Sequence, residues 1–345
     1  MHMGLRFRRT MKIAPGLRLN FNKDSVGLSI GPRGAKYTIN SSGRRTASVG
    51  IPGSGLYYTE SSGGGKRRSQ TDAEIQEAAA QADLQSRPNF LSSSSEKAFY
   101  SFAYNYLSPN QTATYEERRA QAEAVKAEHP DIAPYIDFTM LSYIASRDAK
   151  EALTNCENLY NNATAQFFDS TIAKKYFDEF SARIQIARGI FYTGDFQSNY
   201  LSYTYSELLQ ALGQPEKALE VIQKVKESPF KEIAILDLYL SLKRYDDVLM
   251  ETEDVENIDD LSAIQLIFRA IAFRELDQHE LAIETFKFAL AKRSRPESIR
   301  NYALYERACT YQVMGKKALA IKDLNKILAA DYTDEGAKAK LKELQ

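Results

Sequence analysis

Residues that usually carry chemistry are scarce in this 345-residue chain, which has two cysteines and three histidines. Cys156 and Cys309 are far apart in the sequence, a pattern that fits a reducing compartment better than a disulfide framework. The histidines are dispersed, and no His/Cys cluster has the spacing of metal ligands. The sequence therefore predicts no catalytic residue, no metal and no cofactor, and we expect a protein that is not an enzyme.

Long apolar runs and nucleotide-binding motifs are missing too. No stretch approaches the roughly 18 apolar residues of a membrane span, and the start of the chain has no apolar signal core. Gly65-Lys66 does not complete a phosphate loop, because Glu60 stands where the first glycine would be and Arg67 replaces the Ser or Thr. We expect a soluble cytoplasmic protein without a membrane partner.

Acidic residues are almost absent from the first 68 positions. The first 68 residues hold only two acidic residues, Asp24 and Glu60, and 13 basic ones, which gives a net charge of +11. The remainder of the chain holds 43 acidic and 32 basic residues, a net charge of −11. Twelve of the 17 glycines also occur at or before Gly65. Charge and composition together place a boundary near residues 60–70.

The segment 4–59 alternates apolar and polar residues with a period of two. Turn-forming stretches such as Pro15-Gly16 and Gly31-Pro32 interrupt the alternation. This pattern predicts a small basic all-β domain at residues 1–60, an antiparallel meander of five or six strands with one polar face.

Three stretches of this segment, GLRFRRTMKIAPGLRLNFNK, GPRGAKYTIN and GIPGSGLYYTE, match a known pattern in both strands and turns. Together they resemble an uncharacterised bacterial family, domain of unknown function 4236. The resemblance implies a bacterial origin and supplies no activity.

The predicted polar face of these strands is basic. Its candidate residues are Arg6, Arg8, Arg18, Lys36 and Arg45. A basic face attracts the phosphates of nucleic acid, but it also suits an acidic protein surface, including the acidic part of this same chain. A third possibility is self-association through the exposed edges of so small a sheet.

Residues 61–95 have the composition of a flexible linker with one weak helix. Helical periodicity then predicts helices at 96–107, 112–128, 132–145, 148–161, 171–192 and 197–212. We assign residues 96–198 to a helical domain that continues into the C-terminal part. The aromatic stretch KAFYSFAYNYL, residues 97–107, is expected to pack in its core.

Two C-terminal stretches align without a gap: LIFRAIAFRELDQHELAIETFKFALA, which starts at Leu266, and LYERACTYQVMGKKALAIKDLNKILA, which starts at Leu304. Weaker copies precede them. The small residues Ala218, Val248, Ala282 and Ala320 occupy equivalent positions, and the distance from one to the next rises along the chain. The pattern predicts about four helical hairpins with unequal loops within residues 199–345, followed by a capping helix at 333–344.

This pattern resembles the tetratricopeptide repeat, in which small residues at positions 8 and 20 let two helices approach closely. The expected fold class is mainly α: a tetratricopeptide-like helical solenoid preceded by a small antiparallel β meander domain. The resemblance implies a concave groove lined by the first helix of each hairpin. The lysine, asparagine and arginine that clamp C-terminal carboxylates in one subfamily are absent.

In the tetratricopeptide repeat, positions 2, 5, 9 and 12 of each repeat line the groove. The candidate partner-binding residues there are Tyr200, Tyr203, Phe230, Ile233, Ile267, Ile271, Arg274, Tyr302, Tyr305 and Gln312. Their aromatic and aliphatic character suits an extended peptide or a partner helix.

We therefore expect a non-enzymatic bacterial adaptor or scaffold. Its groove would bind a protein or peptide, and its basic β domain would attach to an acidic surface. The alternative is a nucleic-acid-associated regulator or phage-defence component whose basic β domain contacts DNA or RNA.

Overall fold

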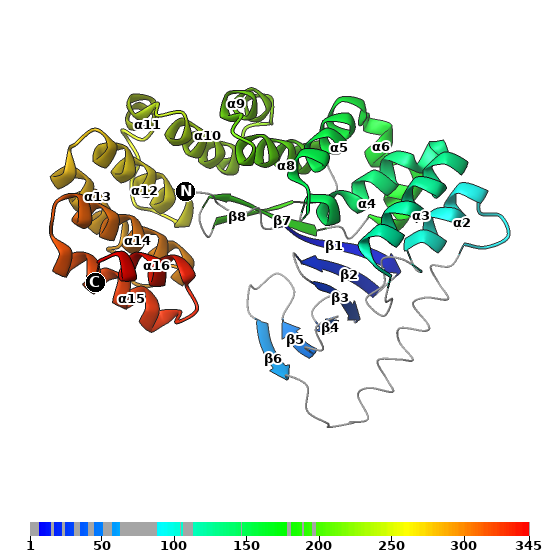
Figure 1. Ribbon diagram of the computed structural model, residues 1–345, viewed down its shortest axis with the longest axis horizontal. Coiled ribbons are helices and arrows are strands. Elements are labelled where there is room, and N and C mark those ends of the chain that lie inside the picture. The colour runs from blue at the N-terminus through cyan, green and yellow to red at the C-terminus, as the bar shows by residue number, and fades with distance from the viewer. Residues whose placement is uncertain are drawn as a thin grey trace. The chain divides into compact units, whose positions relative to one another are not determined.

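The computed structural model (Figure 1) describes residues 7–14, 17–22, 25–30, 35–40, 45–50, 57–62, 88–103, 105, 113–145, 147–177, 181–187, 190–194 and 198–344. For the strands it describes the backbone alone. The predicted linker at 61–95 and its weak helix lie mostly outside these residues.

Eight strands form one sheet in the order β6-β5-β4-β3-β2-β1-β7-β8. Strands β1 to β6 pair antiparallel with their neighbours in the chain, and β1 also pairs antiparallel with β7, where Phe7 lies opposite Ile184. The bounds are β1 Phe7–Ala14, β2 Leu17–Asn22, β3 Ser25–Ile30, β4 Ala35–Asn40, β5 Arg45–Gly50, β6 Tyr57–Ser62, β7 Ser181–Ala187 and β8 Ile190–Gly194.

The predicted fold class is wrong in its β part, because no separate β meander domain precedes the helices. β1 pairs with β7, a strand that follows all the described helices up to residue 176, so the sheet includes a later segment. That segment was predicted to be helical from 171 to 192. The misassignment has a visible cause: SARIQIA, residues 181–187, alternates polar and apolar residues with period two, which favours a strand.

The helices predicted between residues 96 and 161 and at 197–212 are confirmed within a few residues, apart from the C-terminal part of the one at 96–107, which lies outside the described residues. Short polar side chains cap several of them: Thr114 and Glu117 form a capping box at α3, and Asp148 caps α5. The bounds are α2 Ser94–Phe102, α3 Tyr115–Glu128, the 3-10 helix η2 Pro130–Ile132, α4 Ala133–Ala145, α5 Ala149–Asn162, α6 Ala165–Asp169, α7 Thr171–Tyr176 and α8 Ser198–Ala211.

The chain forms two compact units, one made of Met1–Ile184 with Thr193–Leu212 and the other of Gln185–Tyr192 with Gly213–Gln345. The helical core of the first unit is aromatic. Phe99 packs against Tyr176 and Phe177, and the ring of Tyr135 stacks on that of Phe167 with centroids 4.8 Å apart. Phe99 and Phe102 are buried, which confirms the core role predicted for them.

The second unit continues the helical hairpins. Its helices are α9 Pro215–Gln223, α10 Pro229–Ser241, α11 Tyr245–Glu251, α12 Asp260–Glu275, α13 His279–Ala289, α14 Glu297–Val313, α15 Lys317–Ala330 and α16 Glu335–Leu344. The four equivalent small residues, Ala218, Val248, Ala282 and Ala320, are each 0% exposed. This common burial supports the alignment of the hairpins α10–α11, α12–α13 and α14–α15, and of α9 with their second helices.

The turn inside each hairpin gives a second, independent register. Gly213, Lys243, Asp277 and Gly315 have positive φ angles between 58° and 74°, and each precedes the equivalent small residue of its hairpin by the same number of positions. In three of the turns the next backbone N–H donates to the carbonyl five residues earlier, at 2.8 Å. This is the Schellman arrangement that ends a helix in the left-handed conformation.

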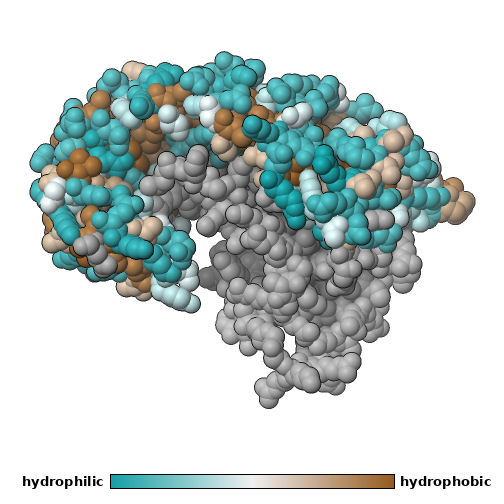
Figure 2. Space-filling model, viewed as in Figure 1, coloured by the Kyte–Doolittle hydropathy of each residue, from teal (hydrophilic) through white to brown (hydrophobic). Residues whose placement is uncertain are grey.

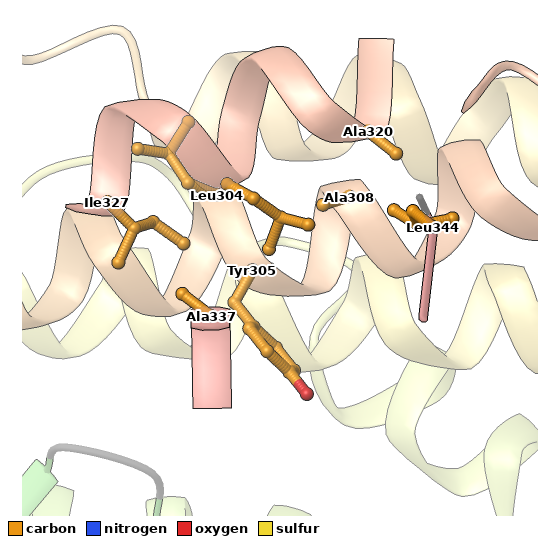
Figure 3. Close-up of a cluster of buried hydrophobic side chains, with 8 residues drawn as sticks. Leu304, Tyr305, Ala308, Ala320, Ile327, Ala337 and Leu344 are labelled. Atoms are coloured by element: carbon orange, nitrogen blue, oxygen red, sulfur yellow. The ribbon is translucent and has the colours of Figure 1, made fainter. Parts of the chain in front are cut away.

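The last helix covers the end of the repeats. Ala337 and Leu344 of α16 are buried with Leu304, Ala308 and Ile327 in one apolar cluster (Figure 3). A helix therefore lies where the capping helix was predicted, and it removes the apolar face of the last hairpin from water.

Candidate partner-binding surface

The ten candidate groove residues all lie on the first helices of the hairpins, α8, α10, α12 and α14. Three of them, Phe230, Arg274 and Gln312, are half-buried. The other seven are buried: Tyr200, Tyr203, Ile233, Ile267, Ile271, Tyr302 and Tyr305. The template therefore places them on equivalent helices, but most of their surface is withdrawn from solvent in this structure.

Helix α12 shows how far this burial extends. Residues 266–268 and 270–272 are all buried, as are Ala263 and Ile264. At 100° per residue these eight positions cover roughly 240° of the helix circumference. A helix that packs by one face has an apolar stripe of about 100° or more. The groove positions of α12 therefore lie inside a buried arc that is much wider than one packing face.

Arg274, the charged member of the candidate groove, is engaged within the repeats. Its Nη1 lies 2.9 Å from Oε2 of Glu306 on α14, and both side chains are 13% exposed. Its Nε donates to Glu275 at 2.9 Å. Such a shielded, charge-assisted pair joins two successive first helices. Glu306 was not among the predicted residues, although it precedes Arg307 in the aligned stretch.

Further contacts join the same helices. Gln265 on α12 donates to Glu232 on α10 at 3.1 Å, and the rings of Phe268 and Tyr302 meet edge to face with centroids 6.3 Å apart. Consecutive first helices are thus linked by polar and aromatic contacts, which fix the spacing between groove positions.

The predicted basic face cannot be placed at side-chain level. Arg6 lies outside the described residues, and the side chains of Arg8, Arg18, Lys36 and Arg45 lie outside them too. The backbone register puts Arg8 opposite Arg183 of β7 and Arg18 between Lys12 and Ser29.

A cavity of about 660 Å³ lies in the first unit, between the start of α4, the end of α5, and helices α6 and α7. Tyr135 and Phe167 form part of its wall. Its two carboxylates are already engaged within the chain: Asp131 accepts a hydrogen bond from Ser95 at 2.8 Å, and Asp137 lies 2.7 Å from the Lys126 ammonium. The cavity wall therefore holds no carboxylate that lacks a partner.

On the face shown in Figure 2, the helices present a largely hydrophilic surface with scattered apolar residues. Large apolar side chains exposed on the second unit include Met250, Leu281, Phe288 and Val313. Leu281 and Phe288 are seven residues apart on α13 and so share one side of that helix.

Several tyrosine hydroxyls are removed from water rather than grouped into a site. Burial raises the pKa of Tyr143, of Tyr176, which lies near Glu96, and of Tyr205, which donates to Glu157 at 2.8 Å. Among the described residues, no three His, Cys, Asp or Glu side chains are grouped so that they could hold a metal ion. Every helix in the described part of the chain is too short or too polar to traverse a bilayer.

These features define a helical-repeat protein with an N-terminal segment of strands. Residues 5–59 match the model of a family described as protein of unknown function (DUF4236). No curated protein matches the chain. Among solved structures, the chain is similar to the N-terminal domain of the EccA1 ATPase from the ESX-1 secretion system of Mycobacterium tuberculosis, with 16% identity, 66% of this chain and 83% of that chain covered, and a TM-score of 0.49.

Proposed function

We propose that this chain is a non-enzymatic protein-interaction scaffold, in which the first helices of tetratricopeptide-like hairpins bind a segment of a partner protein. The observation that carries the proposal is the set of equivalent aromatic and aliphatic residues on α10, α12 and α14, the first helices of three hairpins in one register. Repeats of this kind bind partners through surfaces that extend over several units. An apolar, aromatic lining suits an extended segment or a helix.

The test is quantitative recovery of partners from cell lysate with the full chain as bait. Phe230 and Gln312 are half-buried groove residues, so Phe230→Ala and Gln312→Arg alter the groove with little loss of core packing. We expect both variants to lose the same partner, which purified components must then bind directly. Leu281→Ala and Val313→Ser change exposed residues away from the groove positions, and they should leave recovery unchanged. Equal recovery by all four variants would exclude the groove.

A second function is favoured by the charge of residues 1–68, a net +11. In this alternative the N-terminal segment contacts DNA or RNA, and the chain is a nucleic-acid-associated regulator or phage-defence component. A salt titration of the full chain tests it. Each neutralised phosphate of duplex DNA contributes about −0.9 to the slope of log affinity against log salt, and Arg8→Glu with Arg18→Glu should reduce that slope. Binding that is absent at low salt would exclude the alternative and leave attachment to an acidic protein surface.

A further inference from the structure

The cavity of the first unit has an apolar floor and a polar rim. Its volume of about 660 Å³ is within the range of roughly 300–1,000 Å³ that is usual for ligand sites. The buried side chains of its wall, which form the floor, are all apolar or aromatic: Ile132, Tyr135, Leu159 and Phe167. None of the ten candidate groove residues, which all belong to the described part of the chain, lines this cavity. It is therefore a candidate site separate from the groove.

The rim of the cavity carries exposed side-chain amides. Asn158 and Asn162 lie in the last turn of α5, and Gln166 lies on α6. The Asn162 amide donates to the backbone carbonyl of Asn158 at 2.8 Å, whereas the side-chain amides of Asn158 and Gln166 have no hydrogen-bond partner within the described residues. A carboxamide offers both donors and an acceptor, which complement the groups of a peptide bond. The rim can thus pair with the backbone of a bound peptide.

The formal charge of the cavity wall is negative. Asp131 and Asp137 are its charged residues, and no lysine, arginine or histidine is found among the described residues that line it. Lys126 pairs with Asp137 at 2.7 Å, but it also pairs with Glu123 at 2.7 Å. Asp131 accepts a hydrogen bond from the neutral Ser95 hydroxyl and has no ion-pair partner in the described part of the chain. Two negative charges near the cavity are therefore not neutralised by a cation of the described chain.

The partial charges at the helix ends do not reverse this balance. α2 and α4 begin at the cavity, and α5 ends there. With about half a unit charge at each helix end, the three ends together contribute about +0.5. This is less than the whole negative charge of Asp131, and the two carboxylates that share Lys126 add a second one. A cation in the cavity is therefore favoured, and the apolar floor suits the methylene stem of a lysine or arginine.

We propose that this cavity binds a segment of a partner protein that carries a lysine or arginine side chain. The cation pairs with Asp131, and its stem covers Tyr135 and Phe167. The backbone of the segment forms hydrogen bonds with the side-chain amides of Asn158 and Gln166. A free organic cation has no carbonyl groups to accept from these amides, which favours a peptide as the ligand. This site does not depend on binding at the groove.

Isoleucine methyl resonances of the full chain, followed by nuclear magnetic resonance, test the site. Ile132 and Ile172 line the cavity, whereas Ile283 and Ile321 belong to the second unit and serve as controls. The probes are the end-blocked tripeptides Ala-Arg-Ala and Ala-Gln-Ala. We expect Ala-Arg-Ala to shift the two cavity resonances saturably and to leave the two control resonances unchanged. It should bind about fivefold more tightly than Ala-Gln-Ala, as a well-formed exposed ion pair allows.

Two matched variants locate the cation. Asp131→Asn keeps an oxygen that can accept from the Ser95 hydroxyl and removes the charge. It should lower the affinity for Ala-Arg-Ala to that for Ala-Gln-Ala, and the affinity for Ala-Gln-Ala should stay the same. Glu116→Gln removes an exposed carboxylate of α3 that is not part of the cavity wall, so it should change neither affinity. An equal loss of Ala-Arg-Ala affinity in both variants would contradict the role of Asp131.

The unsubstituted chain alone can overturn the proposal, so the test does not require a variant to fold. Equal affinities for the two tripeptides, or no response of Ile132 and Ile172 to either, would exclude a cation site in the cavity. Propylguanidine carries the cation and stem of arginine without a peptide backbone. If it binds as tightly as Ala-Arg-Ala, the ligand is a free organic cation and the peptide assignment is wrong. Weaker binding of propylguanidine supports the peptide.

Discussion

The hairpins α12–α13 and α14–α15 share one sequence pattern but are stabilised differently. Both have an alanine at position 8 and another at position 20, and all four alanines are 0% exposed. Both also have an arginine at position 7, yet the two arginines have different partners. Arg269 donates to the backbone carbonyls of Thr252 and Glu253, at 2.5 and 2.8 Å. Arg307 forms two hydrogen bonds with the Asp323 carboxylate, at 2.7 and 2.9 Å.

The difference arises from one residue of the second helix. Asp323 of α15 is aligned with Thr285 of α13, whose hydroxyl donates to the Leu281 carbonyl of its own helix. Because α13 has no carboxylate at this position, the earlier arginine reaches back to the preceding hairpin. The shared geometry of a repeat thus comes from its small buried residues, while a polar side chain at one position stabilises either its own hairpin or the contact with the previous one.

The largest effect should come from the buried ion pair of the last hairpin. Arg307→Ala leaves the Asp323 side chain, which is 3% exposed, with only the Lys326 ammonium at 2.9 Å. Removing one partner of a buried pair costs about 3–5 kcal/mol of unfolding free energy. Arg269→Ala removes hydrogen bonds from a charged donor, a loss of about 1.5–3 kcal/mol. Urea denaturation of the two variants measures the difference.

Lys326→Ala is the control for this comparison. The Lys326 side chain is 49% exposed, so its loss should cost at most about 1 kcal/mol. Equal destabilisation by Arg307→Ala and Arg269→Ala would contradict the assignment of different roles to the two arginines.

The second prediction tests what the two hairpins share. Ala270→Leu and Ala308→Leu each insert a larger side chain at a fully buried position. Overpacking of this kind lowers the free energy of unfolding by about 1–3 kcal/mol. The two losses in thermal or urea stability should be similar. Ala330→Leu, at an exposed position of α15, is the matched control and should change stability by less than about 0.5 kcal/mol. A much smaller loss at either site would show that the two interfaces are not equivalent.

The third prediction concerns the turns inside the two hairpins, where Gly315→Ala should lower stability and Asp277→Gly should raise it. Gly315 has a φ of 71° and no atom within 4 Å of an added Cβ, so Gly315→Ala costs only the backbone strain, about 1–2 kcal/mol. Asp277 has a φ of 59° in the equivalent turn. Asp277→Gly relieves that strain at the expense of chain entropy and should raise stability, by less than about 1 kcal/mol. Stabilisation by Gly315→Ala would contradict the left-handed assignment.

The smallest expected effect concerns the starts of α12 and α14. Asp259 caps α12 in a capping box with Ser262, whereas Pro296 precedes α14 without a side-chain cap. Hydrogen bonds from the Ser262 backbone and side chain hold the pKa of Asp259 below its usual value. Because the folded pKa is lowered, the contribution of the cap is present above the unfolded pKa of about 3.9 and is lost as pH falls through the folded pKa.

Amide hydrogen exchange at low pH tests this difference, after correction for the intrinsic pH dependence of exchange. Protection of the first turn of α12 should fall as Asp259 becomes protonated, and protection of the first turn of α14 should not. Asp259→Asn keeps a capping side chain without the charge, so it should remove the pH dependence while retaining most of the protection.

The hairpin register could be predicted from the sequence because it depends on local spacing. The alignment predicted that Ala282 and Ala320 occupy the same position of their repeats. In the structure, Asp277 and Gly315 likewise occupy the same turn position of their two hairpins. Exposure was harder to predict. Ile267 occupies a groove position by its spacing, yet it is 0% exposed, and periodicity alone does not report the tertiary packing that buries a side chain. Period-two alternation in residues 181–187 was present in the sequence and was outweighed by the helical segments around it.

The pairing of β1 with β7 has a consequence for synthesis of the chain. Phe7 lies opposite Ile184, so β1 gains its second neighbour only after Ile184 has left the ribosome. Until then one side of β1 offers unpaired backbone N–H and C=O groups, which is the feature that promotes pairing between chains. Contacts of such long sequence separation also form late. A chaperone that shields the emerging N-terminal strands should therefore increase the yield of folded protein more than one that acts on the repeats, whose contacts are local.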